Sequence, residues 1–387
     1  MRILYHHRIA SKDGQYVHVE ELVAELKKLG HEVCIVGPSV TASASFGSDS
    51  GALRLLRKML PKTIYELLEL AYCLLDFSRL VLAVWRFKPS IIYERFNLFT
   101  PSGIWVQRLF GLPLISEVNA PLVEERSAFG GLALQRVARW SQRYVWTNAD
   151  CVITVTEVLR NIILKYGAAP TNVEVMANGV DLSKFQYDED VRVSKRTSLG
   201  IDDRFILGFT GFVREWHALE NVLNLLPLPA FTNAVLLIVG DGPAVQDLRD
   251  HAERIGVSDR FFVTGIVPRE EVSKYISTFD IALQARVVEY ASPLKVIEYL
   301  ALGRAIVAPR TPNITEILSD GKNAILFSES DAAEMQSAFE SIMKDKQHRD
   351  SLQRAAIESI HTLGLTWSRN ASRVSTIADR LIGDARS

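Results

Sequence analysis

Hydrophobic residues along the chain gather in short runs, and stretches with helical periodicity separate these runs. Residues 15–29, between the first two runs, place apolar side chains on one helical face, and Gly30 follows as a C-cap. Short apolar runs predict buried strands. The expected strands are 3–5, 32–36, 90–93, 113–118, 151–155 and 172–176 in the first half of the chain, and 205–209, 234–239, 260–263, 279–283, 304–308 and 324–327 in the second half.

The expected helices supply the crossovers that parallel strand pairing needs. The pattern therefore predicts an α/β protein with two doubly wound domains, and the polar stretch 188–196 is the expected linker between them. Ligands of such sheets bind beyond the carboxyl ends of the strands. A cleft between two facing domains is therefore the expected site.

Composition narrows the function classes. The 387 residues are 48% hydrophobic and 23% charged, as in a soluble globular protein of two or three domains, which excludes disorder and fibrous classes. With 44 Lys and Arg against 45 Asp and Glu, no global basic field exists that would hold nucleic acid. Residues 1–185 carry 21 basic and 17 acidic residues, a mild excess that favours an anionic partner in this half.

The cysteines and the N-terminus point to the cytoplasm. Cys34, Cys73 and Cys151 lie far apart and form no CxxC pair, so we expect reduced thiols. The apolar stretch at residues 1–5 is too short for a signal peptide. Glu66, Glu69, Asp76 and Arg79 interrupt the apolar segment 64–87, so it is not expected to span a membrane.

The segment around residue 293 carries the sharpest chemical signal. Ser292 is the expected N-cap of a helix, Pro293 its first residue, and Gly303 ends it. The start of such a helix presents free N–H groups to an anion such as a nucleotide diphosphate. Lys295 in the first turn would add a charge, and Glu298 could bind a ribose diol. The alternative is a surface Lys–Glu pair on an ordinary helix.

Residues 290–303 resemble the donor-site signature of family 4 glycosyltransferases, which have the GT-B fold and retain anomeric configuration. Further family segments occur in the same order as in the family. They are Asp13–His18, Gly30–Val33, Ala149–Val155, Asn178–Asp181, Gly211, Val239–Pro243, Thr264–Gly265, Phe279–Ile281 and Trp367. Two segments of the front half, Tyr5–Arg8 and Glu117–Arg126, resemble members from bacterial exopolysaccharide loci.

The resemblance implies two Rossmann-like domains facing across a cleft, with an acceptor-binding domain at 1–187 and a donor-binding domain at 188–366. The closing helix, 367–387, would pack back on the first domain. Glu298 occupies the second glutamate of the family's E-x7-E motif, which binds the donor ribose. The backbone of Pro293 and Leu294 would then face the phosphates or the sugar. Tyr290 stands at the position of the first glutamate.

The family's diphosphate-binding segment has the form G-R-x-x-x-x-K-G, and residues 211–218 occupy it here. Phe212 and His217 replace its two cations, so Arg214 and Lys295 are the expected substitutes. A cation is needed because the leaving diphosphate gains negative charge in the transition state. The further residues predicted to bind the donor here are Gly211, His217 and Gly242.

The first domain holds the remaining candidates. Gly14 would let the chain approach the donor closely because it has no side chain. His18 lies one turn into the following helix and has either a ligand role or a structural one. Asn119 stands where many members have a histidine near the reacting sugar, and it cannot act as a general base. Glu117 shares its strand face, and either Glu117 or Glu124 is the expected activator of the acceptor hydroxyl.

Several other motifs carry no function. Asp188–Asp190 matches a metal-binding D-x-D pattern but follows no strand, so we interpret it as solvated charge. No G-x-G-x-x-G follows the first strand and no P-loop is present, which argues against nicotinamide enzymes and P-loop nucleotidases. The pair at residues 6–7 has no metal-ligand spacing around it. We expect no cofactor and no metal beyond the donor substrate itself.

The expected function is therefore retaining transfer from a UDP- or GDP-sugar to a lipid-linked or saccharide acceptor, in bacterial exopolysaccharide or cell-surface glycan synthesis. Residues 52–87 combine apolar and basic positions and predict contact with the inner face of the plasma membrane, unless they simply cover the first sheet. A nucleotide-sugar epimerase or hydrolase is one alternative. A non-catalytic homologue is the other, suggested by Tyr290, Phe212 and His217.

Overall fold

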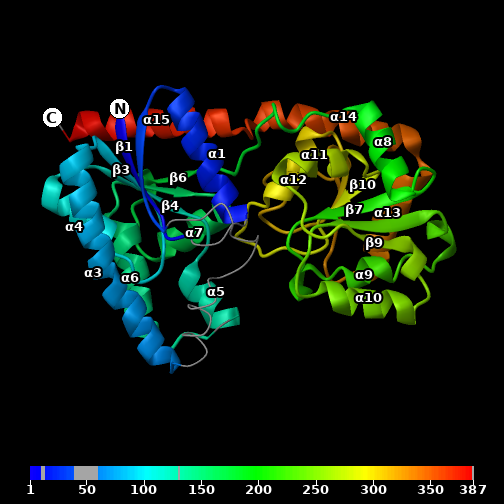
Figure 1. The fold of residues 1–387 in the computed structure, drawn as a ribbon, viewed down its shortest axis with the longest axis horizontal. Helices are drawn as coiled ribbons and strands as arrows, with labels where there is room; N and C mark the ends of the chain where they lie inside the picture. The colour runs from blue at the N-terminus through cyan, green and yellow to red at the C-terminus, as the bar shows by residue number, and fades with distance from the viewer. Residues whose placement is uncertain (10–13, 39–59, 130, 386–387) are drawn as a thin grey trace. The chain divides into compact units, whose positions relative to one another are not determined.

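The computed structural model describes residues 1–9, 14–38, 60–129 and 131–385 (Figure 1). The chain forms two compact units. The first consists of the described residues of 1–177, 290–292 and 367–387, and the second of 178–289 and 293–366. The division thus falls after Ala177 and not after residue 187. No linker occupies 188–196, because these residues begin a helix.

The first unit is built on a parallel sheet of six strands in the order β2-β1-β3-β4-β5-β6. The strands are β1 (Arg2–His6), β2 (Glu32–Val36), β3 (Ile91–Arg95), β4 (Leu114–Val118), β5 (Cys151–Thr154) and β6 (Val173–Val175). The helices are α1 (Gly14–Lys28), α3 (Lys62–Phe87), α4 (Ser102–Phe110), α5 (Leu122–Phe129), α6 (Gln135–Asn148), α7 (Glu157–Lys165), η1 (Pro170–Asn172) and α15 (Trp367–Asp384).

The two faces of this sheet are covered by different helices. Because successive strand residues point to opposite faces, Tyr5 and Tyr93 pack with α1 and α15, whereas Leu4 and Ile92 pack with α3, α4, α6 and α7. Figure 1 shows α15 running beside α1, although more than 300 residues separate them in sequence. The predicted family segment at Trp367 therefore lies in the first unit.

The second unit holds another parallel six-stranded sheet, in the order β12-β11-β10-β7-β8-β9. Its strands are β7 (Phe205–Thr210), β8 (Ala234–Val239), β9 (Phe261–Val263), β10 (Ile281–Leu283), β11 (Ala305–Pro309) and β12 (Ile325–Phe327). Its helices are α8 (Glu189–Leu199), η2 (Glu215–His217), α9 (Glu220–Leu223), η3 (Pro229–Phe231), α10 (Val245–Arg254), η4 (Ser258–Arg260), α11 (Arg269–Ser277), α12 (Leu294–Ala301), α13 (Ala332–Lys344) and α14 (Lys346–Leu363).

The acidic stretch at the start of α8 has a local structural role. The Asp188 carboxylate accepts hydrogen bonds from the backbone N–H groups of Asp190 and Val191, as an N-cap does. The D-x-D pattern is thus the capped beginning of a helix.

The predicted membrane segment is described only in part. Residues 52–59 lie outside the described residues, and 62–87 form α3. Within the described part of the chain, no helix is long and apolar enough to cross a bilayer.

Candidate functional site

The helix that carries the donor-site signature begins one residue later than its sequence predicts. Pro293 has ψ 113° and occupies the N-cap position of α12 without a side-chain cap hydrogen bond, so Ser292 is not the cap. The first helical residue is Leu294. Helix α12 ends at Ala301, and Gly303 adopts a left-handed conformation two residues later (φ 60°).

Lys295 lies against the carboxyl end of β7. Its Nζ is 3.6 Å from the centroid of the Phe209 ring and 3.3 Å from the position that a Cβ would take on Gly211. Partial burial lowers the pKa of Lys295 to about 7, although the charge of Glu298 opposes the shift. An anion bound beside Gly211 would stabilise the charged form of Lys295, which burial disfavours.

The loop after β7 brings a second cation to the same strand end. The Arg214 guanidinium lies near two aromatic rings, 4.9 Å from the centroid of Phe212 and 4.8 Å from that of Trp216. Ala218 has φ 51°, a left-handed conformation, at the position where the family's pattern has glycine. The loop therefore keeps the backbone that the pattern implies, although its side chains differ.

His217 stays neutral and does not replace the family's lysine as a cation. Burial, the charge of Lys295 and the charge of Arg214 lower its pKa to about 3. Its Nδ1 accepts a hydrogen bond from the backbone N–H of Arg214, 3.1 Å away. This acceptor role assigns the remaining proton to Nε2, so His217 can offer one neutral N–H donor.

Gly242 has a packing role in the structure. A Cβ on Gly242 would lie 2.1 Å from the Val213 carbonyl oxygen, and one on Gly240 would lie 2.2 Å from that of Gly211. The backbones of the loops after β7 and β8 therefore touch, as the hydrogen bond from Val213 N–H to the Asp241 carbonyl also shows. Gly242 positions the loop that holds Arg214, and its predicted donor contact stays a prediction.

Glu298 has a partner that sequence analysis missed. Its carboxylate is 5% exposed and pairs with Arg269, whose guanidinium nitrogen is 2.5 Å from Oε1. The Arg269 guanidinium also lies 4.9 Å from the centroid of the Phe185 ring. Arg269 begins α11, directly after a proline, and no local signal in the sequence distinguishes it from the other arginines of the chain.

Tyr290, which stands at the position of the family's first glutamate, is held by the first unit. Its hydroxyl donates a hydrogen bond of 2.8 Å to Glu125, and its carbonyl oxygen accepts one of 2.9 Å from the Thr156 hydroxyl. Burial and the charge of Glu125 raise the pKa of Tyr290 well above its usual range. This side chain therefore stays protonated and cannot offer sugar hydroxyls the charged acceptor oxygens of a carboxylate.

The three predicted catalytic residues of the first unit come together around Glu117, which is 1% exposed. Its Oε2 accepts a hydrogen bond of 2.6 Å from the Tyr93 hydroxyl and lies 3.0 Å from His18 Nε2. Its Oε1 accepts a hydrogen bond of 2.7 Å from Arg95 and another from the Asn119 side chain. β3, β4 and α1 thus supply one buried polar network.

This network holds Glu117 ionised. Burial alone would raise the pKa of Glu117, but the charges of His18 and Arg95, with their hydrogen bonds, outweigh it and hold the pKa well below its usual range. A carboxylate with so low a pKa is a poor proton acceptor. Glu117 is instead placed to orient the side chains of His18 and Asn119. The His18 ring also lies edge-on to the Trp367 ring, with 4.8 Å between the centroids.

The two remaining candidates lie apart from this network. Glu124 accepts hydrogen bonds from the Tyr166 hydroxyl and the Gln142 amide, at 2.6 and 3.1 Å. Gly14 begins α1, and residues 10–13 before it lie outside the described residues. The proposed approach of Gly14 to the donor therefore stays a prediction.

Known proteins resemble this chain in sequence. A glycosyl transferase 4-like domain matches residues 13–179, and the family glycosyl transferases group 1 matches residues 191–359. The curated α-monoglucosyldiacylglycerol synthase of Streptococcus pneumoniae is 24% identical, over 83% of this chain and 73% of its own length. Sulfoquinovosyl transferase SQD2 of Arabidopsis thaliana is 22% identical, over 88% of this chain and 65% of its own length.

Solved structures share the architecture. Anabaena HepE in complex with UDP has a TM-score of 0.78 at 15% identity, covering 98% of this chain and 100% of that one. Sucrose-phosphate synthase from Thermosynechococcus elongatus has a TM-score of 0.79 at 15% identity, and the match covers 99% of this chain and 100% of that one. The predicted fold, two Rossmann-like domains of the GT-B type, is confirmed.

Proposed function

Because the chain belongs to the glycosyltransferases that join a glycosyl transferase 4-like domain to a group 1 domain, we propose that it transfers a sugar with retention of configuration. The donor is a nucleotide-diphosphate sugar, and the acceptor is a saccharide carried on a lipid. The product belongs to a bacterial exopolysaccharide or another cell-surface glycan. The observation that carries the proposal is the pair of cations, Lys295 and Arg214, beside the glycine loop after β7.

The second unit supplies the donor contacts. Lys295 and Arg214 bind the diphosphate, and the Nε2 proton of His217 adds a neutral donor. Glu298, oriented by Arg269, accepts hydrogen bonds from the ribose hydroxyls. UDP is the nucleotide to test first, because HepE has been solved with UDP and with UDP-glucose. A GDP-sugar is the second choice.

The reaction needs no carboxylate nucleophile. In our proposal the bond from the anomeric carbon to the diphosphate oxygen breaks while the acceptor oxygen attacks the same face of the sugar. The acceptor proton moves to the departing diphosphate oxygen, and Lys295 and Arg214 stabilise the charge that develops there. The low pKa of Glu117 supports this route, because it leaves that carboxylate unsuited to take the proton.

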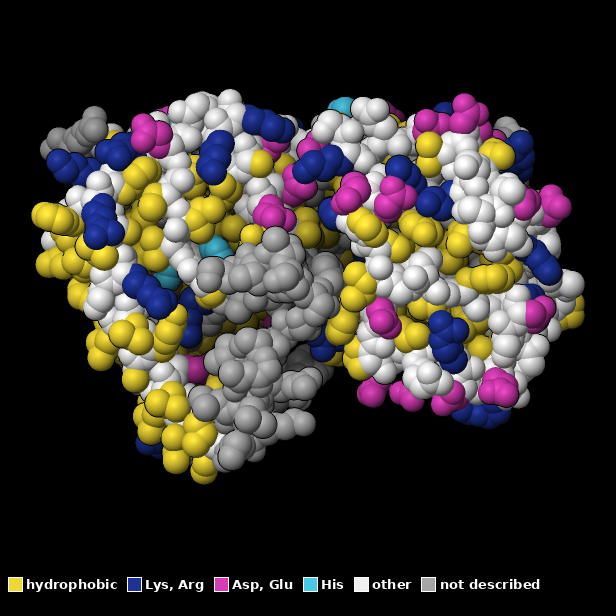
Figure 2. Space-filling view, in the orientation of Figure 1, with side chains coloured by type: hydrophobic (Ala, Val, Ile, Leu, Met, Phe, Trp, Pro, Cys, Tyr) yellow, Lys and Arg dark blue, Asp and Glu magenta, His cyan; other side chains and the backbone are white. Residues whose placement is uncertain are grey.

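The outer face of α3 supports an acceptor at a membrane. Leu74, Leu75 and Trp85 are 60%, 57% and 74% exposed. Arg79 and Arg86 are exposed on the same helix. Where Figure 1 places α3 and α4, Figure 2 shows hydrophobic side chains with Lys and Arg among them. Such a surface suits peripheral contact with an anionic bilayer. The pneumococcal relative, a diacylglycerol glycolipid synthase by name, is consistent with a lipid acceptor.

One assay tests the activity and its alternatives. The protein is incubated with UDP- and GDP-sugars and a lipid-linked saccharide, and NMR follows the anomeric proton. We expect an α-linked product from an α-linked donor, and a β-linked product would overturn retention. Turnover without acceptor would indicate the epimerase or hydrolase. No turnover and no nucleotide binding would indicate a non-catalytic homologue.

A further inference from the structure

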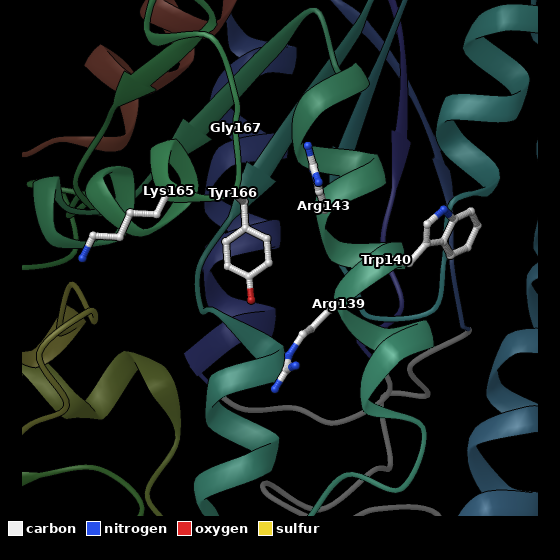
Figure 3. Close-up of a pocket in the computed structure, with 6 residues that line it drawn as sticks. All are labelled: Arg139, Trp140, Arg143, Lys165, Tyr166 and Gly167. Atoms are coloured by element: carbon white, nitrogen blue, oxygen red, sulfur yellow. The ribbon is translucent and has the colours of Figure 1, made fainter.

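A second basic site lies in the first unit, apart from every residue assigned above to the donor. It is a surface cavity of about 500 Å³ lined by Arg139, Trp140 and Arg143 of α6 and by Lys165, Tyr166 and Gly167 at the end of α7. Figure 3 shows Arg139 and Tyr166 facing the same space, with Lys165 and Trp140 extending to either side.

The cations of this cavity lack acidic partners. Among the residues that the structure describes, none of Arg139, Arg143 and Lys165 forms an ion pair, and all three are exposed. Arg139 donates only a long hydrogen bond, 3.4 Å, to Gln135. Arg139 and Arg143 are four residues apart on α6, so they repel each other on one helix face. A bound anion would relieve this repulsion.

The carboxylate that adjoins the cavity is already engaged by neutral donors. Glu124 accepts hydrogen bonds from the Tyr166 hydroxyl and the Gln142 amide. Burial, with the hydrogen bond and charge of Glu124, raises the pKa of Tyr166 to about 12, so this hydroxyl keeps its proton. The site keeps a net positive charge, because three cations outweigh the single carboxylate of Glu124. It lies in the half of the chain that has the excess of basic residues.

We propose that this cavity binds the phosphate group of an anionic ligand. Arginine matches phosphate geometry with two parallel N–H donors. Arg139 and Arg143 bind the phosphate oxygens from one helix, and Lys165 adds a third charge from α7. The Trp140 ring, 50% exposed, can cover an apolar part of the ligand. The phosphate belongs either to a soluble compound or to a phospholipid headgroup, and the experiment distinguishes these sources.

The first arm uses inorganic pyrophosphate and calorimetry. The titration is made in a variant that carries Lys295→Met and Arg214→Gln, so that neither proposed donor-site cation contributes. Adding Arg139→Gln and Arg143→Gln should weaken binding by at least about tenfold. The matched control adds Arg249→Gln and Arg354→Gln, which remove the same charge from exposed positions of α10 and α14 and should leave binding unchanged. Glutamine keeps the helix propensity of arginine.

The second arm measures co-sedimentation with phosphatidylcholine vesicles, with and without phosphatidic acid, for the same variants. Loss of binding by the α6 variant in both arms supports a site for phosphate itself. Loss with vesicles alone assigns the site to a lipid headgroup. If the α6 variant matches the control in both arms, the proposal is overturned. The sugar-transfer assay does not enter this test, so the two proposals can fail independently.

Discussion

Lys295 is the residue whose chemistry depends most on its surroundings. A lysine with a pKa of about 7 is only partly charged at neutral pH, yet its Nζ lies over Phe209 beside the glycine that the diphosphate would approach. A bound diphosphate raises this pKa again, because opposite charge favours the protonated form. Donor binding therefore takes up a proton whenever the pH lies above about 7.

The first prediction follows from this linkage. The affinity for a UDP-sugar, whose diphosphate does not titrate in this range, should be constant below pH 7 and weaken by up to about tenfold per pH unit above it. Calorimetry between pH 6 and pH 9 measures this. Lys295→Met should bind at least about tenfold more weakly with little pH dependence. A wild-type affinity that is flat over the range would contradict the assigned pKa.

Glu117 carries the second prediction, which concerns stability. Glu117→Gln leaves Arg95 buried without its counter-charge, so we expect a loss of about 3–5 kcal/mol in the free energy of unfolding. Because the folded pKa of Glu117 is depressed, its stabilisation is present above the unfolded pKa and is lost as the pH falls toward the folded value. The gap between wild type and variant should therefore narrow below about pH 4.

Glu124→Gln is the matched control in urea unfolding. Glu124 is exposed and accepts hydrogen bonds from neutral groups only, so its replacement should cost no more than about 1.5 kcal/mol. Equal losses for the two variants would show that the network around Glu117 is no stronger than a surface contact.

At the scale of elements, α3 departs from an ordinary covering helix. One face buries Cys73, Leu80 and Val84 against the first sheet, and the opposite face leaves Leu75 and Trp85 more than half exposed. A helix of a soluble protein normally turns polar residues to water. In our proposal of membrane contact, a lipid surface supplies the apolar environment for this exposed face.

The third prediction tests that face. Leu75→Gln with Trp85→Gln should weaken partition onto anionic vesicles by about a hundredfold, since two large side chains would contribute about 3 kcal/mol. Ile357→Gln with Leu363→Gln, at positions 45% and 44% exposed on α14, is the control and should change nothing. Co-sedimentation measures both. Identical partition of the two double variants would remove α3 from the membrane hypothesis.

At the scale of the whole molecule, the two units have separate cores and separate sheets. The proposed donor residues, Lys295, Arg214 and Glu298, belong to the second unit, whereas the network around Glu117 belongs to the first. The chain nevertheless crosses back twice, because residues 290–292 and α15 are part of the first unit. A donor bound to the second unit and a substitution in the first unit can therefore change the stability of different hydrophobic cores.

The fourth prediction uses this separation. A UDP-sugar at a hundred times its dissociation constant should add about 2.7 kcal/mol to the stability of the second unit. In scanning calorimetry, Glu117→Gln should lower the transition of the first unit, and the donor should raise the other one. Lys295→Met should remove most of the donor's effect. If the donor raised only the transition that Glu117→Gln lowers, the donor would bind to the first unit, and its assignment to the second unit would be wrong.

The sequence by itself determined the strands, their parallel pairing and the two-sheet architecture. Runs such as 234–239 are apolar at every position because both faces of a parallel strand are buried, and this leaves a local signal. The positions of Lys295 at a helix start and of Arg214 in the loop after β7 were also predictable, and their contacts with a donor stay predictions. The N-cap of α12 differed, because Pro293 has an extended conformation, and a helix formed where a linker was expected at 188–196.

Only the tertiary structure decided which side chains meet. Glu117 gathers His18, Tyr93 and Arg95 from other segments of the chain, and Arg269 reaches Glu298 from the preceding helix. The ionisation of Glu117 and the near-neutral pKa of Lys295 depend on burial and on these partners. Such contacts arise when separate strands and helices pack together, so no local pattern in the sequence encodes them.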